Sequence, residues 1–169
     1  MKVLVTVASK HGATRGIAEA IAEELTAEHL SVEVKPADEV KTLVGIDAVV
    51  LGSAVYAGSW LPEARAFAFR HYEALALMPI WAFSSGPLGD DPAPMDEPER
   101  LIAPLSDLKV REHQVFVGML NMADLTIPER LVAKAVHAPQ GDFRDWEEIR
   151  DWACTIARTL RAELEFDRA

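Results

Sequence analysis

Short apolar runs alternate with longer amphipathic segments along the chain, and this order is the feature that most restricts the fold. Residues 3–8 (VLVTVA) are rich in β-branched residues and read as a buried strand. Residues 14–29 then place apolar side chains at helical spacing, and residues 149–164 do so again near the C-terminus. Strands that alternate with helices build a parallel sheet covered on both faces, so we expect an α/β fold.

Five strands are expected from this alternation, and their composition separates the edge of the sheet from its centre. Residues 31–35 alternate between polar and apolar side chains, as a strand near a sheet edge does. Residues 46–51 are mostly apolar and end at a glycine, which is typical of a central strand. The other strands are expected at residues 3–8, 78–83 and 115–120. Since 169 residues without an internal repeat suit one domain, we expect it to span residues 1–169.

Charge and cysteine content narrow the class of protein. Acidic residues number 27 and basic residues 17, and this net charge of −10 argues against nucleic acid, whose binding rests on lysine and arginine contacts to phosphates. The lone cysteine, Cys154, cannot form an internal disulfide, and no apolar run is long enough to span a bilayer. Together with the lack of a signal-peptide pattern, these features predict a cytoplasmic protein without a transmembrane segment.

The loop after the first strand is a candidate phosphate site, because ligands of open parallel sheets bind at the carboxyl ends of the strands. This loop leads directly into a helix and consists of Ser9, Lys10, His11, Gly12, Ala13 and Thr14. Its hydroxyls, its glycine and the free N–H groups of the helix N-terminus suit one phosphate group, although a capping turn without a ligand would explain the same residues. Because G-x-G-x-x-G and G-K-[ST] motifs are missing, the phosphate would belong to a mononucleotide.

Two further loops follow the third and fourth expected strands. The loop at residues 53–60 begins with Ser53, Ala54, Val55, Tyr56, Ala57 and Gly58. Its aromatic residues suit a flat, stacking ring, and packing over the sheet is the alternative. The loop at residues 84–91 begins with Ser84, Ser85, Gly86, Pro87 and Leu88. It offers hydrogen bonds to the polar edge of a heterocycle, and a plain turn is the alternative.

This chain lacks the residues that two other classes of protein with a related fold require. A phospho-acceptor receiver domain needs acidic residues after the first strand and at the end of the third, where this chain has Ser9 and Ser53. A serine hydrolase needs G-x-S-x-G after a strand, and residues 82–86 lack the first glycine. The histidines show no metal-ligand spacing, so no metal site is expected.

The chain resembles the flavodoxins, which bind flavin mononucleotide (FMN). The likeness runs from VTVASKHGATRGIAEAIAEEL through LGSAVYAGSW to the C-terminal helix. The flavodoxin phosphate loop is typically Ser/Thr-x-Ser/Thr-Gly-x-Thr, and Ser9, Gly12 and Thr14 match it while His11 replaces a hydroxyl residue. The resemblance implies a flavodoxin-like three-layer sandwich whose five-stranded parallel sheet has the order 2-1-3-4-5, with FMN as the cofactor.

Within the flavodoxins, the chain looks most like the branch of menaquinone-dependent protoporphyrinogen oxidase. The tracts ASKHGATR and VVLGSAVYAG and a terminal DW-x-x-I pattern carry this likeness. That branch has a segment between the last strand and the last helix, where this chain has a shorter and less basic one at residues 121–141. Its middle, residues 127–136, is expected to form a short amphipathic helix near the cofactor crevice.

The resemblance also implies roles for the three loops. Residues 9–14 would hold the FMN phosphate, residues 53–58 would flank the isoalloxazine ring, with Tyr56 as a stacking partner, and residues 84–88 would line its other edge. The flavin carries the chemistry, so no catalytic acid or base is required. The redox partner would be a protein or a quinone, with peripheral membrane contact in the quinone case.

Two functions stay open. The first is an FMN-dependent oxidoreductase with a porphyrinogen-like substrate, which the segment at 121–141 favours. The second is an electron carrier between protein partners, which the acidic composition favours.

Overall fold

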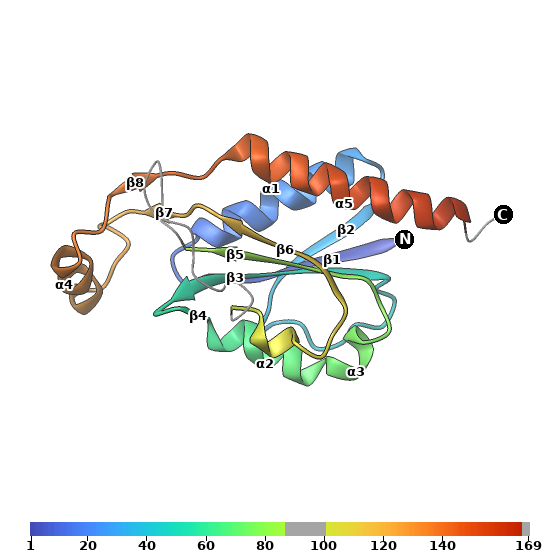
Figure 1. Ribbon diagram of the computed structural model, residues 1–169, viewed down its shortest axis with the longest axis horizontal. Helices are drawn as coiled ribbons and strands as arrows, with labels where there is room; N and C mark the ends of the chain where they lie inside the picture. Colours follow the sequence, from blue (N-terminus) through green and yellow to red (C-terminus); the bar gives the residue numbers. More distant parts are fainter. Residues whose placement is uncertain (87–100, 167–169) are drawn as a thin grey trace.

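Five parallel strands form the centre of the molecule. The computed structural model describes residues 1–86 and 101–166. In this part of the chain the parallel strands are β1 (Lys2–Ala8), β2 (Ser31–Pro36), β3 (Ala48–Tyr56), β5 (Ile80–Ser85) and β6 (Val110–Phe116). They lie in the order β2-β1-β3-β5-β6 (Figure 1), which confirms the expected order 2-1-3-4-5.

Helices cover both faces of this sheet, so the three expected layers are present (Figure 1). One face is covered by α1 (Ala13–Ala27) and α5 (Trp146–Phe166). The other face is covered by α2 (Pro62–Arg70), α3 (Tyr72–Leu75) and the short 3-10 helix Ala103–Leu105. The amphipathic helices expected at residues 14–29 and 149–164 correspond to α1 and α5.

The side chains of β1 divide between the two layers. Val3, Val5 and Val7 join the core beneath α1 and α5, whereas Leu4 and Ala8 join the core beneath α2. This division follows from the two-residue repeat of a strand. Since both faces of β1 are covered, the strand is apolar along nearly its whole length, which is why its position could be predicted.

Three strands have clearly different bounds from those expected, and one of them, the third, is Ala48–Tyr56 and not residues 46–51. The last parallel strand occupies Val110–Phe116 and not residues 115–120, because it is an edge strand whose polar side chains (VREHQVF) hide the apolar signal. The fourth strand is Ile80–Ser85 and not residues 78–83, so Ser84 and Ser85 belong to a strand.

The expected loop at residues 53–60 is instead a β-hairpin. Strand β3 continues to Tyr56, turns at Ala57 and Gly58, and returns as the short strand β4 (Ser59–Trp60), which pairs antiparallel with β3. Both turn residues have positive φ angles, of 49° and 73°. Such a turn follows the right-handed twist of the flanking strands, and Ala-Gly lacks the usual Asn-Gly signature that reveals it in a sequence.

A second, smaller ribbon carries a helix away from the main body. Strands β7 (Met119–Leu120) and β8 (Gly141–Asp142) pair antiparallel, and α4 (Ile127–Ala135) lies between them in sequence. Figure 1 shows α4 projecting at the end of this ribbon, beyond the carboxyl ends of the parallel strands. The helix expected at residues 127–136 is thereby confirmed. Across the described residues, no helix has both the length and the apolar character that a membrane span requires.

Candidate functional site

The turn between β1 and α1 is shaped by Gly12, the residue before the helix. Gly12 has a φ of 86°, in the left-handed region that residues with a Cβ rarely adopt. Gly12 has no side chain that could cap α1, and the first turn of the helix holds no acidic residue. The Ser9 hydroxyl accepts a hydrogen bond from the backbone N–H of Arg15 at 3.3 Å. The turn therefore presents an open helix N-terminus with partial positive charge, which suits an anion.

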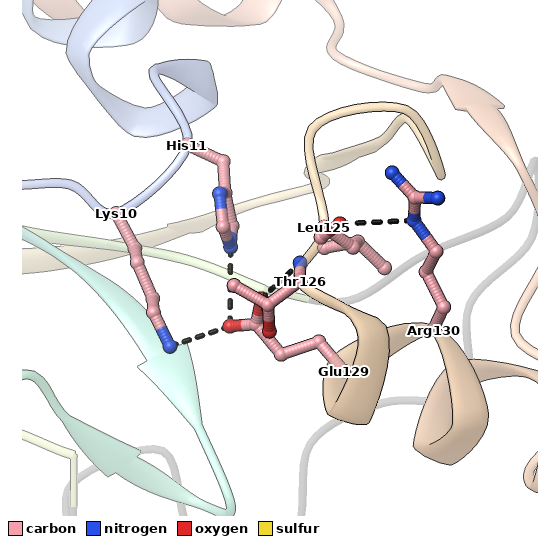
Figure 2. A network of polar contacts seen from close by, with 6 residues as sticks. All are labelled: Lys10, His11, Leu125, Thr126, Glu129 and Arg130. Carbon is pink, nitrogen blue, oxygen red and sulfur yellow. Dashed lines mark hydrogen bonds and ion pairs between the residues drawn. The ribbon is translucent and has the colours of Figure 1, made fainter.

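Two side chains of this turn meet a carboxylate from a distant part of the chain (Figure 2). Lys10 Nζ lies 2.5 Å and His11 Nε2 lies 3.3 Å from Oε1 of Glu129, on α4. The other carboxylate oxygen, Oε2, accepts hydrogen bonds from the backbone N–H and the hydroxyl of Thr126, at 2.8 and 2.7 Å. These bonds, foremost that from Lys10, hold the pKa of the Glu129 carboxyl well below its usual range. The same contact raises the pKa of the Lys10 ammonium.

Glu129 is a site residue that reasoning from the sequence missed. Its local role was readable, because Thr126 and Glu129 have the S/T-x-x-E spacing of a capping box at the start of an amphipathic helix. Its contact with Lys10 joins residues 119 positions apart, and no spacing pattern reports such a pairing.

Tyr56 approaches the same turn from the hairpin. Lys10 Nζ lies 5.4 Å from the centroid of the Tyr56 ring, and the His11 ring lies 6.5 Å from it at a tilt of 53°. The ring is partly buried, and this burial raises the pKa of the Tyr56 hydroxyl. The phosphate-loop candidate and the aromatic candidate are therefore neighbours in space.

Ser53 and Ser84 are buried beneath the hairpin and do not face the cavity. The Ser53 hydroxyl donates to the carbonyl of Ala54 at 2.8 Å and accepts from the backbone N–H of Leu61 at 3.0 Å. Ser84 Oγ accepts from Trp60 Nε1 at 2.8 Å and lies 2.8 Å from His113 Nε2. Both hydroxyls thus fasten the hairpin to the sheet.

A largely apolar cavity of about 520 Å³ opens at this end of the sheet. Its volume lies within the range of about 300–1,000 Å³ that is typical of small-molecule sites. The predicted site residues that line it are Ser9, Lys10, His11, Ala13, Thr14, Ala54, Val55, Tyr56, Ala57, Ser85 and Gly86. The predicted residues that do not line it are Gly12, Ser53, Gly58 and Ser84, and Pro87 and Leu88 lie outside the described residues.

The far wall of the cavity comes from the segment that carries α4. Its apolar lining includes Met119, Leu125, Val132 and Val136, and its polar lining consists of Asn121, Asp124 and Glu129. None of the α4 residues is buried, so the helix covers the cavity without joining a core. The cavity therefore has a polar end at the β1–α1 turn and an apolar end under α4.

The fold and this arrangement agree with a known family. The flavodoxin domain family matches residues 4–146, so the chain belongs to the flavodoxin domain family. A comparison with curated proteins finds no match.

Solved structures with the same fold include several flavodoxins. Oxidised flavodoxin 2 from Bacillus cereus aligns with a TM-score of 0.66 and 22% identity, over 94% of this chain and 99% of that one. A flavodoxin from the domain Archaea aligns with a TM-score of 0.65 and 18% identity, over 95% and 99% of the two chains.

A larger protein also shares the fold. Rubredoxin oxygen:oxidoreductase from Desulfovibrio gigas aligns with a TM-score of 0.65 and 19% identity, over 96% of this chain. The alignment spans 37% of the larger chain, so the likeness concerns one part of that protein.

Proposed function

We propose that this protein is an FMN-dependent oxidoreductase of the flavodoxin family that resembles menaquinone-dependent protoporphyrinogen oxidase. FMN would supply two-electron and one-electron redox chemistry, and the protein would supply binding and orientation. The observation that carries the proposal is the cavity of about 520 Å³ that joins the β1–α1 turn, the hairpin and α4.

The polar end of the cavity supports binding of the FMN phosphate. The open N-terminus of α1, the hydroxyls of Ser9 and Thr14 and the Lys10 ammonium all border it. Backbone N–H groups, hydroxyls and a cation are the donors that a phosphate monoester requires. The donor set therefore fits the phosphate of the cofactor.

The middle of the cavity supports binding of the flavin ring. Residues 54–57 of the hairpin border it, and the Tyr56 ring is adjacent to the phosphate-loop side chains. A tyrosine with 39% of its surface exposed retains area against which a flat ring can stack. Ser53 and Ser84 would act indirectly, by fastening the hairpin that carries Tyr56.

The apolar end of the cavity favours an enzyme over a carrier. Leu125, Val132 and Val136 extend the cavity beyond the phosphate and ring regions. Apolar walls of this kind can hold an apolar substrate beside the ring. A flavodoxin-type carrier between protein partners is the alternative, and it is favoured by the net charge of −10, which suits a basic partner.

An anaerobic assay separates the two functions. We expect the purified protein, loaded with FMN, to oxidise protoporphyrinogen with a soluble menaquinone analogue as electron acceptor. Turnover no faster than that of free FMN would contradict the proposed enzymatic function and would favour the electron carrier.

Two variants on α4 test whether the apolar end of the cavity, here called the apolar chamber and lined by Leu125, Val132 and Val136, holds the substrate. Val132 lines the cavity and is 63% exposed, whereas Leu131 is 65% exposed and does not line it. We expect Val132→Asp to lower kcat/KM at least about tenfold, because it removes apolar contacts and adds a charge, with FMN content unchanged. Leu131→Asp is the matched control and should retain the parent value. Equal losses in both variants would contradict the assignment of the chamber.

A further inference from the structure

α4 is connected to the β1–α1 turn through the carboxylate of Glu129 (Figure 2). Oxygen Oε2 belongs to the helix itself, because it accepts the two capping hydrogen bonds from Thr126. Oxygen Oε1 reaches across the cavity to Lys10 at 2.5 Å and His11 at 3.3 Å. One side chain thus begins the helix and also ties it to the turn.

Among the described residues, the other polar contacts of α4 lie within its own segment. Arg130 donates from Nε to the carbonyl of Leu125 at 2.9 Å and from a terminal nitrogen to the carbonyl of Ala123 at 3.1 Å. No α4 residue is buried, and Ile127 remains 75% exposed. With so little packing, the contact of Glu129 with Lys10 and His11 strongly influences where α4 lies.

A phosphate at the turn would compete with Glu129 for the same partners. A phosphate monoester carries a charge of about −1.5 to −2 near neutral pH. The other cation of the turn, Arg15, pairs with Glu19 at 3.0 Å and does not line the cavity, whereas Lys10 does. Lys10 is therefore the ammonium that can turn to a phosphate, and the Glu129 carboxylate that holds it would repel the same anion.

We infer that Glu129 is an internal competitor for the cofactor phosphate, and that FMN binding releases α4 from the turn. This inference rests on the proposed binding of FMN at the β1–α1 turn. By linkage, if FMN binding weakens the contact of Glu129 with Lys10 and His11, this contact weakens FMN binding by the same factor. The consequence is that the apolar chamber under α4 opens when the cofactor is in place.

Glu129→Gln tests the competition, because glutamine can still accept the capping hydrogen bonds but lacks the charge. We expect the Kd for FMN to fall at least about fivefold, the lower end of typical coupling between sites. The Kd for riboflavin, which lacks the phosphate, should stay at the parent value.

Glu63→Gln is the matched control for general electrostatics. Glu63 on α2 lies near enough to Lys10 to raise its pKa, yet the described residues show no ion pair between them. We expect this variant to leave the ratio of the FMN and riboflavin Kd values close to that of the parent. A ratio unchanged in Glu129→Gln, or changed equally in both variants, would overturn the inference.

Hydrogen exchange reports the release of α4 directly. FMN should speed amide exchange in residues 127–135 of the parent protein, whereas riboflavin should not. In Glu129→Gln these amides should exchange quickly without any flavin. Slower exchange with FMN would overturn the inference while leaving the proposed function intact, whereas a parent protein that binds no FMN would overturn both.

Discussion

Gly12→Val is expected to weaken FMN binding about 100-fold. Gly12 has a φ of 86°, which is costly for a β-branched residue, by about 1–3 kcal/mol. A turn that relaxes to avoid this strain redirects the N–H groups at the start of α1. The loss of two hydrogen bonds to a charged phosphate, at about 1.5 kcal/mol each, corresponds to that change in Kd. Titration of the apoprotein with FMN, followed by flavin fluorescence, measures it.

The control for this variant is Gly45→Val. Gly45 also has a positive φ, 77°, and a Cβ at either glycine would have no heavy atom within 4 Å. Both variants should therefore lose similar stability on thermal unfolding, from backbone strain and not from collision. Gly45 precedes the amino end of β3, at the opposite end of the parallel sheet from the β1–α1 turn, so its variant should bind FMN as the parent does. Unimpaired FMN binding by Gly12→Val would show that the phosphate lies elsewhere.

Gly52→Ala is expected to destabilise the fold by about 3 kcal/mol or more. Gly52 on β3 pairs with Phe83 on β5, and an added Cβ would lie 2.0–2.5 Å from three atoms of the Phe83 ring. Phe83 cannot easily move, because it is fully buried and packs near Phe116 and Trp152, with ring centroids 6.1 and 6.3 Å away. Overpacking of a tight core typically costs about 1–3 kcal/mol and sometimes more. Urea unfolding gives the value.

A double variant shows whether the ring is the cause. Phe83→Leu removes the atoms that the new methyl group would meet, so Gly52→Ala should cost much less in that background than in the parent. Additive losses would mean that the strain lies in the backbone of β3 and not in the contact with Phe83.

The central sheet was predictable because its signals are local. Strand β1 is covered on both faces and is apolar along nearly its whole length, and α1 places Ile17, Ile21 and Leu25 at four-residue intervals. These patterns arise from the geometry of a single helix or strand, so they can be recognised without knowing which elements pack against it. The order of the strands followed from the family resemblance and is confirmed.

The errors fall where tertiary context decides. The edge strand β6 contains Arg111 and Glu112, so its apolar content is too low to reveal it. The turn at Ala57 and Gly58 adopts positive φ angles with an alanine in the first place. Ser84 follows an apolar run and reads as a loop residue, yet its hydroxyl is engaged by Trp60 and His113 inside the protein.

The loops that form the candidate site could be predicted from the sequence, but the contact of α4 with the β1–α1 turn could not. The residues of the β1–α1 turn and of the hairpin were named from loops that follow strands, and most of them line one cavity. The wall formed by α4 was anticipated only as a helix near the crevice. The contact between Lys10 and Glu129, which closes the cavity, depends on the path of the β7–β8 ribbon.

A comparison of FMN with riboflavin on the unmodified apoprotein tests the account most directly. The two ligands share the ring and differ only in the phosphate, so their difference in affinity reports the phosphate site at the β1–α1 turn. The account predicts that FMN is taken up one to one and binds more tightly than riboflavin by at least about 100-fold, the equivalent of two charge-assisted hydrogen bonds. Equal affinities for the two ligands, or no uptake of FMN, would contradict it.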